Sequence, residues 1–448
     1  MQTEERGFHT TRRRFIGTMG AVGASLYMAG SPQRSQSAAP DKLETLALNG
    51  GPKAVTAQPE NPTKWPLYGE EEVQAVSELI RNPNYEPVAQ FEEAWKAYHD
   101  CPHAKAHCNG TSALTSMLFT LQLPARSEVL VADYSTWFPV VPMRFFDLVP
   151  VFVDVNPRTM NIDVEDCKRR LSGKTRAIMP VHWWGLPCDM DDIETFAKEH
   201  GLEVVEDASH AHGARVQGKL VGKWGRMAGF SMQSTKPLPS IEGGVGMYKS
   251  QEDFELATTY GNYDLPKTFP EDSPYRKYQG TALGSKLRIH PVSAILARIQ
   301  LKTLDARSHA IASQVRRLNE RLIQLPGLSE QYARPDMKRA YYSSNMLFFD
   351  EAKAGMSRSS AVQALKAEGV EANEYSWTLL HTHPVFKEAQ WWRHMPTLPA
   401  EGSVPGCDEA NRRALTLPLF TSEQPELVDQ YIAAFEKVWA HREKLSGV

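Results

Sequence analysis

The sequence predicts an α/β fold with a mainly parallel sheet flanked by helices, followed by a smaller α+β C-terminal domain. Two observations indicate it. Between about residues 100 and 250, short apolar runs alternate with segments whose apolar residues recur at helical spacing. After about Pro291, longer helical patterns replace this alternation. Strands that alternate with helices are typical of a parallel sheet covered on both faces.

The elements follow in chain order. Short apolar runs predict strands at residues 128–132, 149–155, 176–181, 202–206, 228–232 and 244–248. Helical spacing predicts helices at 112–121, 164–171 and 191–200. Beyond Pro291 we expect a long helix that runs through 318–325, a strand at 345–349, and helices at 359–368 and 425–442. These elements predict a large domain at 41–290 and a small domain at 291–448.

Composition limits the classes of partner. The chain has 448 residues, of which 42% are hydrophobic and 23% charged, so fibrous and disordered classes are excluded. Its formal net charge of -3 supplies no positive field for nucleic acid, and a small-molecule partner is expected instead. The five cysteines show no zinc-like spacing, so we expect structural or free thiols and no metal site.

The first forty residues resemble an export signal. Arg12-Arg13-Arg14-Phe15-Ile16 precedes a short, glycine-rich apolar run at 18–30, the build of a twin-arginine signal. We therefore expect residues 1–40 to be a signal and spacer, and the protein to be periplasmic or otherwise extracytoplasmic. The run is too short for a comfortable membrane span, so no stable membrane association is expected after signal removal. The alternative is a basic tail on a cytoplasmic protein.

Two side chains with reactive chemistry follow neighbouring strands. Asp207 ends the run Val204-Val205-Glu206, where an acid is well placed to pair with a positively charged ring nitrogen. About thirty residues later, Lys236 follows another strand and precedes the glycine-rich turn at 242–246. Ligands of parallel sheets bind beyond the carboxyl ends of the strands. Both side chains are therefore expected at one edge of the sheet.

A third motif, Asn109-Gly110-Thr111-Ser112, opens a predicted helix. Free N–H groups at a helix N-terminus, with hydroxyls beside them, make a phosphate site. The same residues also form an ordinary N-cap. The order and spacing of the three motifs favour the phosphate site.

From about Leu46 to the C-terminus, the sequence resembles the DegT/DnrJ/EryC1/StrS aminotransferases. Besides the segments around Asp207 and Lys236, the matching motifs are Leu48-Asn49-Gly50-Gly51-Pro52, Gly69-Glu70-Glu71-Glu72, Phe91-Glu92-Glu93-Ala94, Asn109-Gly110-Thr111, Val151-Phe152-Val153-Asp154-Val155, Pro180-Val181-His182-Trp183-Trp184-Gly185 and Leu283-Gly284-Ser285-Lys286-Leu287-Arg288. The resemblance implies the aspartate-aminotransferase fold, which is fold type I of the pyridoxal-phosphate (PLP) enzymes. It implies PLP as cofactor.

The resemblance also implies roles for individual residues. Lys236 would form the Schiff base with PLP and shuttle a proton, and Asp207 would keep the pyridine nitrogen protonated. The other cofactor-binding residues implied are Gly110, Thr111 and Ser231 at the phosphate, His210 near the ring hydroxyl, Trp137 stacked on the ring and Asn262 reaching the phosphate from a second subunit. That last contact would make the protein a homodimer.

Some of these assignments have alternatives. His210 could instead be a solvated or capping histidine, and Trp137 a core side chain, because the alignment there is uncertain by one residue. His182, before Trp183-Trp184, would either touch substrate or be structural. Gly243 and Gly244 more simply serve the turn after the lysine.

The resemblance implies transfer of an amino group from an amino acid, glutamate or glutamine, to a keto sugar or similar ketone in carbohydrate or polysaccharide biosynthesis. Alternatives are another PLP-dependent sugar reaction, or an exported binding or regulatory protein without turnover. Lys236-Pro237-Leu238-Pro239 departs from the family pattern, which points to an unusual substrate. An exported enzyme would not meet nucleotide-linked sugars made in the cytoplasm. Either the signal is not functional, or the acceptor is a free keto sugar, a keto-cyclitol or another ketone.

Overall fold

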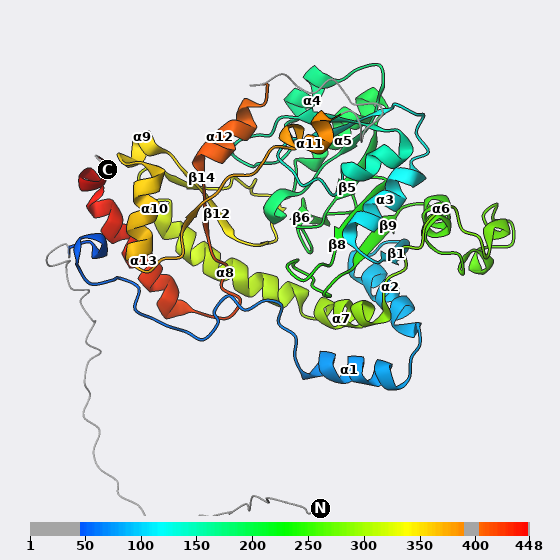
Figure 1. The fold of residues 1–448 in the computed structure, drawn as a ribbon, viewed down its shortest axis with the longest axis horizontal. Coiled ribbons are helices and arrows are strands. Elements are labelled where there is room, and N and C mark those ends of the chain that lie inside the picture. The colour runs from blue at the N-terminus through cyan, green and yellow to red at the C-terminus, as the bar shows by residue number, and fades with distance from the viewer. Residues whose placement is uncertain (1–44, 389–402, 447–448) are drawn as a thin grey trace, which may run out of the picture. The chain divides into compact units, whose positions relative to one another are not determined.

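A computed structural model describes residues 45–388 and 403–446 (Figure 1). The expected export signal at 1–40 lies outside the described residues. Within the described ranges, no helix combines the length and apolar character needed to cross a bilayer. The chain from Glu44 onward forms one compact unit, and the domain division at residue 290 stays a prediction.

A seven-stranded sheet forms the centre of the large part of the fold. Its strands in spatial order are β1 (His103–His107), β9 (Gly244–Tyr248), β8 (Met227–Ser231), β5 (Glu203–Asp207), β4 (Thr175–Met179), β2 (Glu128–Ala132) and β3 (Val149–Val153). Only β9 runs antiparallel to its neighbours; the other pairs are parallel. This confirms the mainly parallel sheet, and each predicted strand lies within two residues of an observed one.

Strand β1 has no counterpart among the predicted strands. Its sequence, His103-Ala104-Lys105-Ala106-His107, contains no apolar run. Lys105 is nevertheless buried, and its ammonium lies 2.8 Å from the carboxylate of Glu92, which compensates the buried charge. A polar strand can therefore lie inside the fold because a helix supplies its counter-charge.

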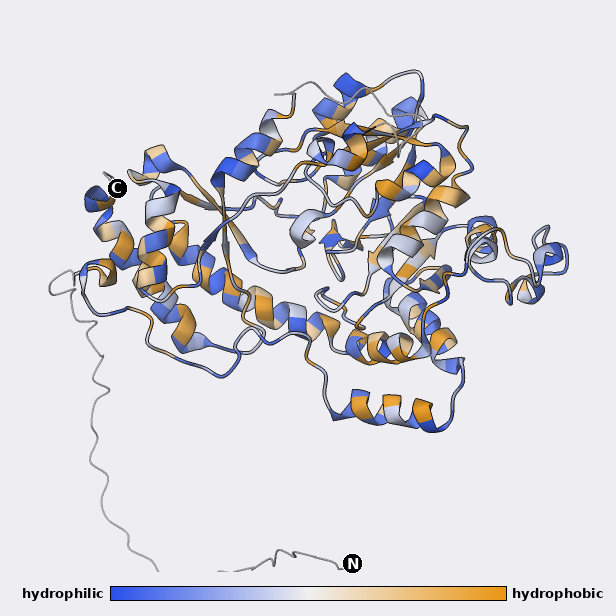
Figure 2. Cartoon of the chain, viewed as in Figure 1, coloured by the Kyte–Doolittle hydropathy of each residue, from blue (hydrophilic) through white to orange (hydrophobic). Residues whose placement is uncertain are grey.

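Helices flank this sheet, and Figure 2 shows apolar residues gathered in its strands and on parts of the helices around it. The helices of this part of the chain are α2 (Glu86–His99), α3 (Gly110–Thr120), α4 (Val164–Arg170), α5 (Met190–His200), α6 (Gln251–Gly261) and α7 (Pro291–Leu301), with α1 (Glu70–Arg81) packed against α7. Side-chain caps fix several of their starts: Asn109 accepts from the N–H of Ser112 in α3, and Ser250 accepts from the N–H of Asp253 in α6.

A second, antiparallel sheet follows in the C-terminal part of the chain, in the order β10 (Leu328–Glu330), β12 (Asn345–Phe349), β14 (Ala414–Leu417) and β13 (Asn373–Glu374). It shares an apolar core with α8 (Leu304–Leu322), α10 (Arg358–Ala367) and α13 (Pro425–Ala440). The shorter elements are β6 (Arg215–Val216), β7 (Lys219–Leu220), β11 (Met337–Lys338), α9 (Glu351–Ala354), α11 (Pro384–Lys387) and α12 (Pro405–Arg413).

The single long helix predicted after Pro291 is wrong. The structure has two helices there, α7 and α8, separated at Lys302 and Thr303. Thr303 leaves the helical conformation, with φ -113° and ψ 2°, so the helix is interrupted before Leu304. Apolar spacing continues across the break, and for this reason the sequence pattern does not reveal it.

The stretch from Leu46 to Ala54 packs against the smaller sheet's core. Leu46 is fully buried there. The N–H groups of Ala47 and Ala54 donate to the carboxylate of Glu368, at 2.8 and 3.0 Å. The ammonium of Lys437 lies 2.9 Å from the same carboxylate, so this buried acid has both a counter-ion and backbone donors.

All five cysteines lie within the described residues as free thiols: Cys101, Cys108, Cys167, Cys188 and Cys407. The last three are buried, and burial raises the pKa of each of these three thiols. Thiols of this kind serve packing, because the thiolate is the reactive form.

His99, buried in α2, makes folding sensitive to acid. Burial, opposed by a hydrogen bond with the backbone of Trp95, lowers the pKa of His99 to about 3. The unfolded imidazole takes up a proton below a pKa of about 6.5, whereas the folded one stays neutral, so the free energy of unfolding falls as the pH drops from about 6.5 to about 3.

In His99→Phe, unfolding takes up one proton fewer. We therefore expect the slope of unfolding free energy against pH to become shallower by about 1.4 kcal/mol per pH unit below pH 6. Urea unfolding between pH 4.5 and 8 measures the slope. At pH 8 the imidazole is neutral in both the folded and the unfolded protein. Any difference in unfolding free energy between the variant and the wild type at this pH therefore reports packing alone. An unchanged slope would contradict the assignment.

Candidate active site

A cavity of about 450 Å³ lies at the carboxyl ends of β5 and β8, beside the N-terminus of α3. Most of the residues predicted for the site line it: Gly110, Thr111, Asp207, His210, Ser231 and Lys236. They come from three separate stretches of chain, which the parallel strands β5 and β8 and the start of α3 bring to one edge. Asp207 and Lys236 therefore face one common space.

Two glycines allow the start of α3 to approach the strands closely. A Cβ atom on Gly110 would lie 2.6 Å from the Cβ of Ser231, and one on Gly244 would lie 2.3 Å from the carbonyl oxygen of Asn109. Larger side chains at either residue would push the helix away from β8 and β9. The first N–H groups of a helix have no intrahelical acceptor. The cavity thus has a helix N-terminus and the Ser231 hydroxyl at one end, a fit for an anionic group. Gly244 therefore allows the close contact between β9 and the start of α3, in addition to the turn after Lys236.

Asp207 is the buried acid of the site. Its carboxyl is buried, and the N–H of Ser209 donates to Oδ1 at 3.1 Å. Burial raises the pKa of Asp207, while the hydrogen bonds from Ser209 and the positive charge of Lys236 work in the opposite direction. A cation placed against Asp207 would further favour the ionised carboxylate.

Lys236 contacts an aromatic residue that sequence reasoning missed. Its Nζ donates to the hydroxyl of Tyr342 at 3.1 Å and lies 4.3 Å from the centre of that ring. The same hydroxyl lies 3.2 Å from the Oγ1 of Thr235. Tyr342 comes from the segment before β12, 106 positions after the lysine, and no motif marks it. Only the fold brings it to the site.

His210 packs on the other side of this arrangement. Its ring stacks on Tyr342 with centroids 4.1 Å apart and an interplanar angle of 19°. Burial, followed by the charge of Lys236, lowers the pKa of His210 well below its ordinary value, so the imidazole is neutral. Its Nδ1 is buried and has no hydrogen-bond partner within the described residues. A neutral ring with an unsatisfied nitrogen suits a ligand hydroxyl in the cavity.

We expect Tyr342→Phe to lower kcat by about 10-fold, since a hydrogen bond to a charged amine is worth about 1.5 kcal/mol or more, while the KM for the amino donor stays the same. The phenyl ring keeps the stacking on His210, so the melting temperature should change little. Steady-state kinetics and thermal melting measure the two effects. Tyr342→Leu, which removes the ring as well, is the comparison; full turnover in Tyr342→Phe would contradict a role for the hydroxyl.

Two predicted residues are not among those that line the cavity. Trp137 is 41% exposed, with its ring in edge contact with His383, whereas its neighbour Phe138 lines the cavity. Asn262, at the end of α6, is buried, and neither atom of its amide has a partner within the described residues. Its predicted contact involves a second subunit, so the roles of Trp137 and Asn262 stay predictions.

His182 has a structural environment. It is fully buried, and its Nδ1 accepts from the N–H of Cys188 at 3.0 Å, so the ring proton lies on Nε2 and points to Glu206 at 3.2 Å. Glu206 also accepts from the N–H groups of Gly222, Trp224 and Gly225. Burial alone would raise the pKa of Glu206, but these hydrogen bonds lower it. Of the two readings left open for His182, the contacts favour the structural one.

Comparison with known proteins gives a consistent result. The model of the DegT/DnrJ/EryC1/StrS aminotransferase family matches residues 66–436. The spore coat polysaccharide biosynthesis protein SpsC of Bacillus subtilis is 28% identical over 384 residues, which cover 84% of this chain and 96% of SpsC. A putative L-glutamine:3-amino-2,3-dideoxy-scyllo-inosose aminotransferase of Micromonospora echinospora is 28% identical, over 73% of this chain and 78% of that protein.

Solved structures show the same fold. An aminotransferase from Psychrobacter cryohalolentis superposes with a TM-score of 0.76 at 24% identity, and covers 84% of this chain and 98% of its own. The structure of 3-amino-5-hydroxybenzoic acid synthase superposes with a TM-score of 0.70 at 26% identity, over 84% of this chain and 98% of that chain.

Proposed function

Since the chain belongs to the DegT/DnrJ/EryC1/StrS aminotransferase family and is a PLP-dependent aminotransferase, we propose that it moves an amino group from glutamate or glutamine to a keto sugar or a similar ketone. The observation that carries this proposal is the meeting of Lys236, Asp207 and the N-terminus of α3 around one cavity. An amine, a buried acid and an anion site in one space match the three ends of PLP.

The residues present fit the cofactor. The cradle that Gly110 keeps open beside Ser231 would hold the phosphate, together with the hydroxyl of Thr111. The unpartnered Nδ1 of His210 would accept from the ring hydroxyl, and Asp207 would pair with the ring nitrogen. Phe138, which lines the same cavity, has an apolar ring available for contact with the cofactor.

When bound, PLP supplies a ring that accepts the electrons left on the substrate carbon as a proton departs. Asp207 supports this by holding a positive charge at the ring nitrogen. Lys236 would hold the cofactor covalently, and its free amine would move the proton between the substrate carbon and the cofactor carbon. The hydroxyl of Tyr342 accepts from this amine, and the hydroxyl of Thr235 contacts that of Tyr342 in turn.

The names of the relatives support the choice of acceptor. SpsC is named for the biosynthesis of a coat polysaccharide, and the protein from Micromonospora echinospora for an amino-cyclitol ketone. Both names point to polyhydroxylated products. We therefore place the acceptor of this chain among hydroxylated cyclic ketones.

The test is a donor screen with the purified holoenzyme. Each candidate amino acid is added without an acceptor, and the cofactor released after denaturation is analysed for pyridoxamine phosphate. We expect formation of one equivalent with glutamate or glutamine, and its loss when a keto sugar is added. An enzyme that binds PLP yet forms none with any donor in the panel would contradict transamination, and would favour another sugar reaction or a protein without turnover.

We also propose a homodimer in which Asn262 of each subunit serves the partner's phosphate. The buried amide without a partner in the described part of the single chain supports this, because such groups are rarely left unsatisfied. A dimer mass in sedimentation, together with weaker PLP binding in Asn262→Ala, is the expected result. A monomer with full activity would contradict it.

Export by the twin-arginine route is a further part of the proposal, supported by Arg12-Arg13 ahead of a short apolar run. Cell fractionation of the full chain is its test. We expect the wild type outside the cytoplasm and the double variant Arg12→Lys, Arg13→Lys retained inside. An equal distribution of the two would favour the cytoplasmic alternative.

A further inference from the structure

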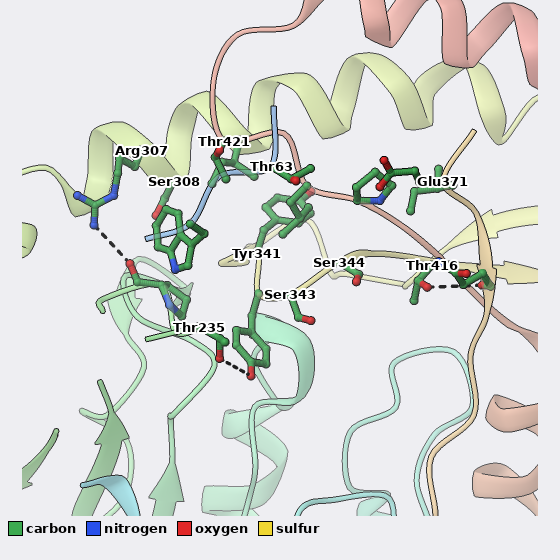
Figure 3. Close-up of a pocket in the computed structure, with 18 residues that line it drawn as sticks. Thr63, Thr235, Arg307, Ser308, Tyr341, Ser343, Ser344, Glu371, Thr416 and Thr421 are labelled. Carbon is green, nitrogen blue, oxygen red and sulfur yellow. Dashed lines mark hydrogen bonds between the residues drawn. The ribbon is translucent and has the colours of Figure 1, made fainter. Parts of the chain in front are cut away.

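A second cavity, of about 400 Å³, lies next to the cofactor cavity (Figure 3). Tyr342 lines both of them. Thr235 and Pro237, on either side of Lys236, line the second one, and the indole N–H of Trp65 donates to the Lys236 carbonyl at 3.2 Å. The two spaces therefore meet at the lysine.

Half of the side chains that line the second cavity carry a hydroxyl group. Figure 3 shows hydroxyl side chains from the segment before α1, from α8 and from the approach to β12 arranged around one space. Within the described residues, no hydrogen bond engages the hydroxyls of the following side chains: Thr63, Ser308, Tyr341, Ser343 and Ser344. Groups that both donate and accept are the natural partners of a ligand that carries several hydroxyls of its own.

The charge of this wall argues against a diphosphate. Among the described residues that line the cavity, Arg307 is the only basic side chain and Glu371 the only acidic one. The guanidinium of Arg307 already donates to the carbonyl oxygens of Gln300, at 3.1 Å, and Pro237, at 3.4 Å, and burial lowers the pKa of Arg307 to about 10. Diphosphate groups are bound by several cations or by clusters of N–H donors. A wall with one engaged cation and one carboxylate supplies neither.

The aromatic and aliphatic part of the wall fits the carbon face of a ring. Trp65 and Tyr341 contribute aromatic surface, and Ile311, Leu417 and Leu419 contribute aliphatic surface. Trp65 is held in place by its bond to the Lys236 carbonyl, and the Arg307 guanidinium lies 5.5 Å from its ring centre. The cavity volume lies within the range of small-molecule sites, which is about 300–1,000 Å³.

We propose that the second cavity binds the ring of the amino acceptor as a neutral polyol, a keto sugar or keto-cyclitol without a nucleotide diphosphate. This inference rests on the proposed aminotransferase function. With its ring among the free hydroxyls, the acceptor directs its carbonyl past Tyr342 to the amino group held at the Lys236 site. The cavity would then recognise the acceptor through its hydroxyl groups, without a charged group such as a diphosphate.

The first experiment measures binding without turnover. Scyllo-inositol, a ring polyol that has no carbonyl, is titrated into the PLP holoenzyme by calorimetry, followed by uridine diphosphate as the anionic probe. We expect one inositol site per chain and no competition from the nucleotide. Competition by uridine diphosphate, or absence of inositol binding, would overturn the proposal. The donor screen is independent of both outcomes, so a failed binding test and a failed aminotransferase assignment can be told apart.

The second experiment uses a matched pair of variants on α8. Ser308→Leu fills the cavity from a helix position that tolerates leucine, and Ser313→Leu makes the same change at an exposed position of the same helix. We expect Ser308→Leu to weaken inositol binding and to raise the KM for the neutral acceptor by 10-fold or more. Formation of pyridoxamine phosphate from the donor should be unchanged in both variants. Equal acceptor KM values in the two variants would overturn the proposal.

Discussion

Lys236→Ala is expected to remove the covalent link to PLP and to lower turnover by about 10³-fold or more, because one side chain provides both the attachment and the proton transfer. Borohydride treatment followed by peptide mapping locates the link. In the wild type, the PLP label should be found on the peptide that contains Lys236. In the variant, it should be absent from the whole chain.

Lys353→Ala is the control for this experiment, because Lys353 lies on the short helix α9 with its side chain 76% exposed. It should keep both the label and the turnover. A PLP label on another lysine in the wild type would contradict the assignment of Lys236 as the attachment site. Turnover that persists in Lys236→Ala would contradict its role in proton transfer. Tyr342 would then hold the lysine amine for a purpose other than catalysis.

Asp207→Asn should give the second-largest loss. The amide keeps the size of the carboxyl group and can still accept the Ser209 N–H at Oδ1, but it carries no negative charge. We expect PLP to remain attached at Lys236 while turnover falls by about 10²-fold or more, as for other preorganised charges in enzyme sites. The absorbance spectrum of the holoenzyme and single-turnover rates measure the two effects separately.

The neighbouring acid supplies the control. Glu206 precedes Asp207 in β5, so its side chain points to the opposite face of the sheet, where it binds His182 and the N–H groups of Gly222, Trp224 and Gly225. Glu206→Gln should lower stability by about 3 kcal/mol, as expected when a buried charge network is broken, with turnover retained in the folded fraction. Wild-type turnover in Asp207→Asn would contradict a role of Asp207 in catalysis. Inactivation of Glu206→Gln without loss of stability would contradict a purely structural role of Glu206.

The sequence alone predicts much of the central sheet and the meeting of Asp207 with Lys236. Both succeed for one physical reason: buried parallel strands are continuous apolar runs, and their carboxyl ends share an edge. Strand β1 fails the same test, because its lysine is neutralised by Glu92 from a helix and not by a neighbour in sequence. A pattern of hydropathy carries no information about such a pair.

Contacts between distant segments account for the other residues that were missed. Tyr342 reaches Lys236 only after the chain has crossed α7 and α8, and Trp65 reaches the lysine carbonyl from 171 residues upstream. Phe138 rather than Trp137 lines the cavity, a difference of one residue that an aromatic pair in a loop cannot reveal. The free hydroxyls of the second cavity come from three such segments, none of which carries a motif.

The anchoring of the first described residues limits where a protease could trim this protein. Leu46 fills an apolar site, and the peptide groups of Ala47 and Ala54 satisfy a carboxylate that would otherwise face Lys437 alone. A cut before residue 45 would leave all of these contacts in place. A cut a few residues later would leave the Leu46 site empty and remove backbone donors from the buried Glu368 carboxylate, so it would lower the stability of the fold.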